Sequence, residues 1–435
     1  MSTTIARGLA PVRSVLPNGA VIIAQETVMT PAVTISAVFR AGSAYEPPAW
    51  PGLAYLTGRV IDRGTEGRSA AAIAQELDER GVSMKVSTNR HNLSLSCTCL
   101  AEDFTELLDI LLDVARSPVF PEAEIAKRRG EAITAVRQDE DNPAVRAVEG
   151  LLALLYGDAH PYGRSVKGTP VSLERITRRD IVGFHAERIR PSALSLAIVG
   201  DVSPERAIEQ SRTVLEGWHA DPVGRVGIPP VAAPVERRTR SIAMPGKSQA
   251  DIAYGFTSIR RLDPRYYAYW MLNNILGQFG LGGRLADNIR ERQGMAYYAY
   301  SSFDPAPAEA PLIIRAGVDP RNVDRAIAAI DHEVATLGKD GPTDQEMAET
   351  REFLVGSIPR LLETNQSIAS FLQVAEEFGL GLDYDRRLPD LLRAVTLGEV
   401  RAAAQEVLHA DRASVSVAGP PVPCCADSRG PEAPV

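Results

Sequence analysis

Histidine and cysteine, which bind catalytic zinc and act as nucleophiles in many enzymes, are few in this chain and are not arranged as a metal site. None of the six histidines lies three or four residues from another, the spacing that places two imidazoles on one helix face. Cys97 and Cys99 alternate with leucines in a strand-like segment, so we expect a core stripe. Cys424 and Cys425 could bind metal or oxidise, but an inert tail is the expected role. His91 falls in a predicted hairpin turn and is expected to be solvated.

Residues 52–65 read G-L-A-Y-L-T-G-R-V-I-D-R-G-T and are predicted to be helical. They resemble the zinc-binding helix of the M16 (pitrilysin/insulinase-type) metallopeptidases, G-x-A-H-x-x-E-H-x-x-x-x-G-T, which carries the inverted motif H-x-x-E-H. Tyr55 and Arg59 stand at the two histidine ligands, and Gly58 stands at the general-base glutamate. A phenol and a guanidinium do not replace neutral imidazoles on zinc, and Arg59 brings a permanent positive charge to the cation's position.

The third zinc ligand implied by the resemblance is a glutamate that precedes a D-x-P turn by a few residues. Anchored on the turn Asp141-Asn142-Pro143, this position is Ala135, which has no ligand atom. All three ligands and the base are therefore replaced, and we expect no zinc and no hydrolysis from this chain alone.

Further motifs extend the resemblance over residues 14–418. The first half has H-P-Y-G at 160–163, G-T-P at 168–170 and V-G-D-V at 199–202, as in M16B peptidases. In the second half, residues 276–297 resemble the family pattern "LGG…SRL…REekGLaY".

Within this second pattern, Arg290 and Tyr297 are seven residues apart, as in the arginine and tyrosine that M16 enzymes direct at the peptide. A tyrosine hydroxyl donates to the scissile carbonyl as negative charge builds on its oxygen, and an arginine fork binds a peptide carbonyl or orients the tyrosine. Without the resemblance, Arg290 would be read as a helix-end cation and Tyr297 as a core aromatic.

The chain is expected to be an α+β protein of two homologous halves, each an antiparallel sheet packed against helices, as in the clam-shell halves of LuxS/MPP-like metallohydrolases. We predict an N-terminal domain at 1–219, a linker at 220–235, a C-terminal domain at 236–418 and a flexible tail at 419–435. The linker is rich in proline, glycine and valine and has no helical period.

The two halves share a local pattern that suggests an internal duplication. Residues 75–82 and 287–294 both read as a helix that ends at a glycine and is followed by a strand. Residues 172–189 are expected to form one helix, and residues 242–256 one extended segment. Thr343 and Glu346 form a predicted capping box.

Composition excludes several classes of function. Lys and Arg total 47 against 55 Asp and Glu, a net charge of −8, which argues against nucleic acid as a partner. No apolar run reaches the length of about 18 residues that a membrane span requires, and no signal peptide is recognised. We therefore expect a cytoplasmic protein whose partners are peptides and proteins.

The resemblance implies a non-zinc, Arg/Tyr-type subunit of a heterodimeric M16B peptidase. The chain itself would hold no cofactor, and a homologous partner would supply zinc, its ligands and the base. One alternative is a structural or assembly subunit, like the core proteins of a respiratory complex. Another is a peptide-binding module without an enzymatic partner.

Overall fold

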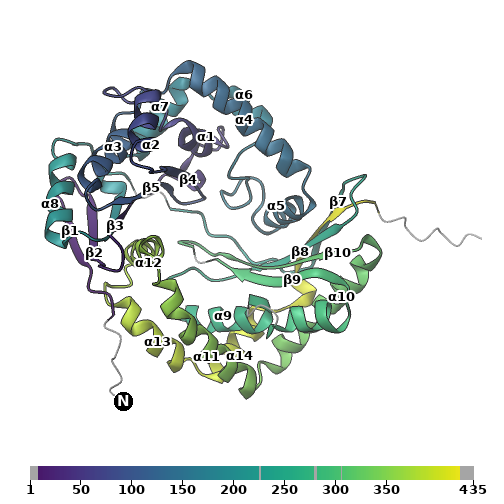
Figure 1. The fold of residues 1–435 in the computed structure, drawn as a ribbon. Coiled ribbons are helices and arrows are strands. Elements are labelled where there is room, and N and C mark those ends of the chain that lie inside the picture. Colours follow the sequence, from purple (N-terminus) through teal and green to yellow (C-terminus); the bar gives the residue numbers. More distant parts are fainter. Residues whose placement is uncertain (1–7, 225–226, 279–281, 305, 422–435) are drawn as a thin grey trace, which may run out of the picture.

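The computed structural model describes residues 8–224, 227–278, 282–304 and 306–421. It contains two halves, each with one mostly antiparallel sheet and helices packed on it (Figure 1). The predicted α+β class is therefore confirmed.

The first half contains six strands, eight α-helices and two short 3-10 helices among the described residues. In chain order the strands and α-helices are β1 (Val12–Val15), β2 (Val21–Glu26), β3 (Ala32–Phe39), α1 (Leu53–Val60), α2 (Ala70–Asp78), β4 (Lys85–Thr88), β5 (Leu93–Leu100), α3 (Phe104–Arg116), α4 (Glu122–Glu140), α5 (Pro143–Tyr156), α6 (Pro170–Arg175), α7 (Arg178–Arg188), β6 (Leu194–Gly200) and α8 (Pro204–Leu215).

The second half has five strands, helices of α type and two π-helical segments, η3 and η5. In chain order they are β7 (Arg238–Ala243), β8 (Ala250–Thr257), α9 (Tyr266–Asn273), η3 (Asn274–Gln278), η5 (Ala286–Arg292), β9 (Ala296–Phe303), β10 (Pro311–Val318), α10 (Val323–Asp340), α11 (Asp344–Leu361), α12 (Asn365–Glu377), α13 (Tyr384–Ala394), α14 (Leu397–Val407) and β11 (Ser414–Gly419).

The two sheets have the same strand order once β1 is set aside. The first runs β1-β2-β6-β3-β5-β4 and the second β7-β11-β8-β10-β9. In each, the last strand of the half pairs in parallel with the first of the shared strands, β6 with β2 and β11 with β7. The predicted glycine stops are also present, because Gly81 and Gly294 have φ angles of +62° and +60°.

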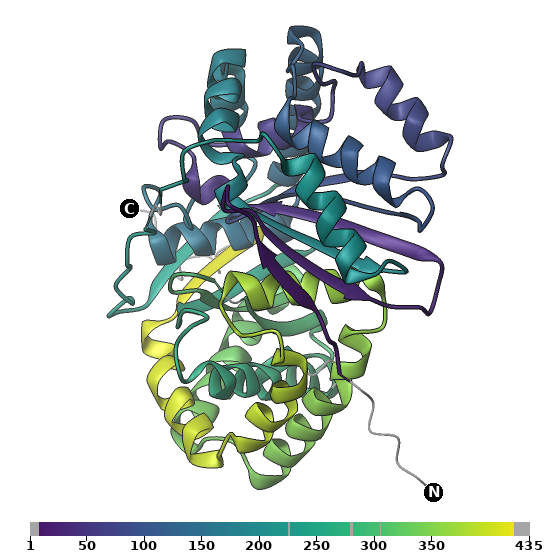
Figure 2. The ribbon, with the colours of Figure 1, turned by 90° about the vertical axis from the view of Figure 1, so that its left-hand side faces the viewer.

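Each half gives one helix to the sheet of the other. Helix α5 packs on β8 and β11 of the second sheet, and α12 packs on β3 and β6 of the first. Gly150 permits the close approach of α5, because a Cβ there would overlap the Ser416 side chain. On the other side, Asn365 and Gln373 of α12 donate to the backbone carbonyls of Ala32 and Ser36 at 3.0 and 2.7 Å. Figure 2 shows the two halves stacked on one another.

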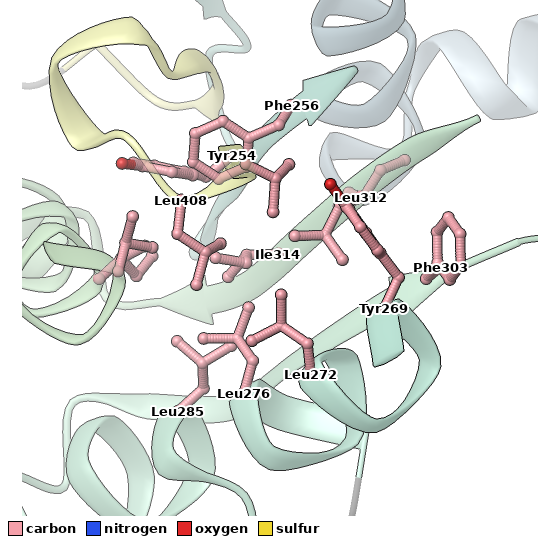
Figure 3. Packing of buried hydrophobic residues seen from close by; sticks show 14 of the residues in the cluster. Tyr254, Phe256, Tyr269, Leu272, Leu276, Leu285, Phe303, Leu312, Ile314 and Leu408 are labelled. Carbon is pink, nitrogen blue, oxygen red and sulfur yellow. The ribbon is translucent and has the colours of Figure 1, made fainter. Parts of the chain in front are cut away.

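The core of the second half lies between its sheet and the helices α9, α10 and α14. Tyr254, Phe256, Leu312 and Ile314 of the central strands meet Tyr269 and Leu272 of α9 and Leu408 after α14 (Figure 3). Leu276 of η3 and Leu285 extend this core under β9. Buried apolar residues therefore hold the segment that carries Arg290 against the core of the second half.

Local sequence signals explain some element boundaries and correct others. Thr343 and Glu346 form the predicted capping box at the start of α11. Residues 172–189 do not form one helix, since Thr177 begins α7 with its own capping box to Asp180. Residues 242–256 are not one extended segment either, because β7 and β8 are separate strands.

Between Leu215 and Arg238, the described residues contain no helix or strand. None of the helices in the described ranges combines the length and the hydrophobicity that a membrane span needs.

Candidate functional site

Helix α1 begins with a buried carboxylate at its N-terminus. Glu46 accepts hydrogen bonds from the backbone N–H groups of Gly52 (3.0 Å) and Ala54 (3.1 Å). Gly52 has a φ of +91°, which favours glycine at the turn into the helix. Burial raises the pKa of Glu46 to about 7, although these N–H groups favour its charged form. This cap fixes the orientation of the helix that carries Tyr55, Gly58 and Arg59.

The position of the second motif histidine is occupied by an ion pair. Arg59 Nη2 lies 2.8 Å from Glu131 Oε2, and Glu131 also accepts from Arg128 Nη1 at 2.9 and 2.8 Å. Arg128, and then Arg59, holds the pKa of Glu131 below its usual value. Glu131 lies on α4 one turn before Ala135, on the same helix face. A guanidinium neutralised by a carboxylate thus stands where the family motif places a zinc ligand.

At Gly58, the position of the motif's general base, strand β4 leaves no room for a side chain. A Cβ on Gly58 would overlap Oγ1 of Thr88 on β4 and would lie 3.7 Å from Leu93 Cδ1. A glutamate at position 58 could enter only if Thr88 moved. Tyr55, at the first ligand position, is half-buried and packs against the core of the first half.

These residues do not fit a zinc ion. Neither the phenol, the glycine nor the alanine provides the neutral nitrogen or the carboxylate that zinc needs, and Arg59 repels a cation. Throughout the described part of the chain, no cluster of three or more His, Cys, Asp or Glu side chains could hold a metal.

Arg290 and Tyr297 lie in the second half and are both exposed. Arg290 is on η5, with 46% of its side chain accessible and its Nε 3.4 Å from Glu291 Oε1. Tyr297 is 83% exposed, an unusual value for an aromatic residue in a strand. The structure therefore excludes the alternative of a core aromatic for Tyr297.

Both residues occupy irregular backbone. Arg290 lies in a π-helix, and Tyr297 lies in a β-bulge at the start of β9. In the register of β9 with β10, Ala296 is opposite Val318 and Tyr298 is opposite Gly317, which leaves Tyr297 without a partner. π-Helical segments and bulges are frequent at functional sites, where they redirect side chains.

Other expectations have mixed outcomes. Cys97 and Cys99 are buried, and burial raises their pKa values to about 12 and 11, as expected for a core stripe. His91 was wrongly expected to be solvated, since it packs edge-on against Tyr162 and burial lowers its pKa to about 4. Cys424 and Cys425 lie outside the described residues.

Sequence reasoning did not identify Glu131 or Thr88. Glu131 lies 72 residues after Arg59, on the same helix as the position expected for the third ligand. The D-x-P anchor favoured Ala135, one helical turn later. The one signal in the sequence that could have pointed to Glu131 is that the charged Arg59 requires a nearby negative charge. No sequence signal could reveal the closeness of Thr88 to Gly58.

Comparisons with known proteins agree with this geometry. Residues 21–169 match the family model "Insulinase (Peptidase family M16)", and residues 175–354 match "Peptidase M16 inactive domain". An uncharacterized zinc protease of Streptomyces coelicolor is 27% identical, over 94% of this chain and 89% of its own length. A non-peptidase homolog, YmxG of Helicobacter pylori, is 24% identical over 87% of each chain.

Solved structures show the same fold. A peptidase M16 inactive domain from Pseudomonas fluorescens superposes with a TM-score of 0.89 and 27% identity, over 95% of this chain and 98% of that one. A protease from Helicobacter pylori gives 0.86 at 17% identity, over 95% and 100% of the two chains. The family models, the relatives and the fold agree, and the chain belongs to the M16 (insulinase) peptidase family.

Proposed function

We propose that this chain is the zinc-less subunit of a heterodimeric, cytoplasmic M16B zinc metallopeptidase. A homologous partner chain supplies the zinc ion, its ligands and the general base. This chain binds the extended peptide and directs Arg290 and Tyr297 at it. The observation that carries the proposal is the exposure of these two side chains on a π-helix and a β-bulge.

The partner's zinc, when bound, would supply Lewis-acid chemistry at the scissile carbonyl and a water of lowered pKa. The Tyr297 hydroxyl donates a hydrogen bond to the carbonyl oxygen as negative charge develops there. The Arg290 guanidinium binds a neighbouring peptide carbonyl and holds the substrate in place. Both roles require side chains that solvent and substrate can reach.

The first half supports the division of labour. Arg59 is neutralised by Glu131, and the space for a base at Gly58 is closed by Thr88. Restoring hydrolysis in this chain would require several substitutions that also repack α1 against β4 and α4. The findings thus favour an inactive member of the family over a peptidase that acts alone.

A second candidate is a structural or assembly subunit with no part in proteolysis. The relative named as a non-peptidase homolog, and the closed base position, are the observations that favour it. It makes no demand on the exposure of Arg290 and Tyr297.

Steady-state kinetics on a quenched peptide distinguishes the two. The chain is mixed with a homologous M16B chain that has an intact H-x-x-E-H motif, and activity should require both. Tyr297→Phe should lower kcat by roughly 100-fold, since it removes one oxyanion donor, with assembly and zinc content unchanged. Arg290→Ala should lower kcat/KM at least as much.

Tyr300→Phe is the matched control, because it removes the same atom from a ring on the same strand and should leave kcat unchanged. If Tyr297→Phe and Arg290→Ala both keep wild-type kcat and KM, the pair is outside the active site. The structural subunit would then be the better assignment.

A further inference from the structure

Three residues form a row across three adjacent strands beside Tyr297. Tyr298 of β9 is opposite Gly317 of β10, and Gly317 is opposite Asp251 of β8. The Tyr298 hydroxyl donates to Asp251 Oδ1 across the middle strand. A Cβ on Gly317 would lie 2.6 Å from Cε1 and 3.1 Å from Cζ of Tyr298, and 2.6 Å from Gln249 Nε2, so the ring and the Gln249 amide both lie directly over the glycine. The absence of a side chain at position 317 is what lets the ring cross.

Asp251 is a strong anchor for this hydroxyl. It is only 2% exposed, and Gln249 Nε2 approaches its two carboxylate oxygens at 3.3 and 3.2 Å. Burial, and then the hydrogen bond to Asp251, raises the pKa of Tyr298, so the phenol stays a donor over the physiological pH range. Hydrogen bonds to a charged acceptor in a buried site are stronger than neutral ones.

The hydrogen bond from Tyr298 to Asp251 holds a strand that is weakly paired. Strand β9 is at the edge of the sheet, and within the described ranges β10 is the one strand that pairs with it. At Tyr297 the bulge also interrupts the pairing with β10. The bond from Tyr298 to Asp251 skips β10 and ties the end of the bulge to β8. Rotation of the bulge would redirect the Tyr297 side chain, and this bond opposes it.

We propose that Asp251 and Tyr298 are positioning residues that fix the bulge and thereby aim Tyr297 at the peptide. This inference rests on the proposed function for the role of Tyr297. It adds that a clamp, the ring of Tyr298 held over Gly317 by its hydrogen bond to Asp251, sets the direction of the exposed Tyr297 side chain.

The first arm of the test uses this chain alone and needs no partner. Amide hydrogen exchange is measured over residues 295–300 in wild type, Tyr298→Phe and Gly317→Ala. Both variants should exchange faster there by more than their loss of global stability in urea accounts for, since one removes the bond and the other displaces the ring. Tyr300→Phe is the control and should exchange like wild type. Asp251→Asn keeps an acceptor oxygen and should retain most of the protection.

The second arm uses the reconstituted heterodimer. Tyr298→Phe should lower kcat about tenfold through misplacement of Tyr297, with KM within about twofold of wild type. The double variant Tyr297→Phe/Tyr298→Phe should be no slower than Tyr297→Phe, because the clamp acts only through the Tyr297 hydroxyl.

Two results would overturn the inference. One is unchanged exchange in Tyr298→Phe and Gly317→Ala. The other is a loss in kcat for Tyr298→Phe that multiplies with that of Tyr297→Phe, which would mean an independent role. Failure of the proposed function is recognised separately, by wild-type kcat in Tyr297→Phe, and the exchange arm then still decides whether the clamp fixes the bulge.

Discussion

Gly58 stands where the family motif has its general base, and Thr88 Oγ1 occupies the space that a side chain there would need. Whether a substitution of Gly58 stabilises or destabilises the protein therefore depends on this one atom. Gly58→Ala adds a Cβ that overlaps Oγ1 of Thr88, and such overpacking costs about 1–3 kcal/mol. Replacing glycine by alanine within a helix gains about 1 kcal/mol. We therefore expect Gly58→Ala to destabilise the wild-type protein by up to about 2 kcal/mol. In a Thr88→Ala background the overlap is gone, and Gly58→Ala should stabilise by about 1 kcal/mol.

The assay is urea unfolding of wild type, both single variants and the double variant, followed by circular dichroism. The four free energies of unfolding form a double-mutant cycle, and the expected coupling is about 1–3 kcal/mol. A coupling below about 0.5 kcal/mol, the scatter of independent sites, would refute the packing of α1 against β4 described here. So would stabilisation by Gly58→Ala in the wild-type background.

Three further predictions follow from the first half and its boundary. The purified chain should hold no stoichiometric zinc, and EDTA should leave its melting temperature unchanged; one equivalent of zinc by elemental analysis would contradict the assignment of Tyr55 and Arg59. His91 has a folded pKa of about 4 against an ordinary 6.5, so only the unfolded state gains its proton between these values, and the stability of wild type relative to His91→Asn should fall by about 3 kcal/mol as pH drops from 7 to 4. The difference between the two proteins is the readout, because Glu46, whose pKa is raised to about 7, changes the total stability in the opposite direction over this range. His91→Asn should lack this contribution, and a pH-independent difference between the two proteins would refute it. Limited proteolysis should cut first within residues 216–237 or 419–435, and a first cut inside any helix would argue against the linker.

Much of the fold could be predicted because its signals are local. The Thr343 capping box, the glycine stops at Gly81 and Gly294, and the alternating pattern of β5 depend on neighbours in sequence. The packing of α5 and α12 on the sheet of the opposite half could not be predicted, since it depends on contacts between residues far apart in the chain. The break at Thr177 had a local signal, its capping box with Asp180, which competed with an otherwise continuous helical pattern.

The candidate site likewise has features that could be predicted from the sequence and features that could not. Residue types at Tyr55, Gly58 and Arg59 exclude zinc ligation by chemistry alone. How this chain accommodates them depends on packing, because Glu131 and Thr88 contact the helix from α4 and β4. The family resemblance selected Arg290 and Tyr297, but only the structure showed that both are exposed.

The matching strand order of the two halves supplies an internal control for the role of the second half. Helix α2 followed by β4 corresponds in sheet position and glycine stop to η5 followed by β9. In the first half this unit is a regular α-helix and a four-residue strand. In the second it is a π-helix and an eight-residue strand with a bulge. Because the same topology forms without these irregularities, the fold does not require them, and their coincidence with Arg290 and Tyr297 is best explained by a requirement on where those two side chains point.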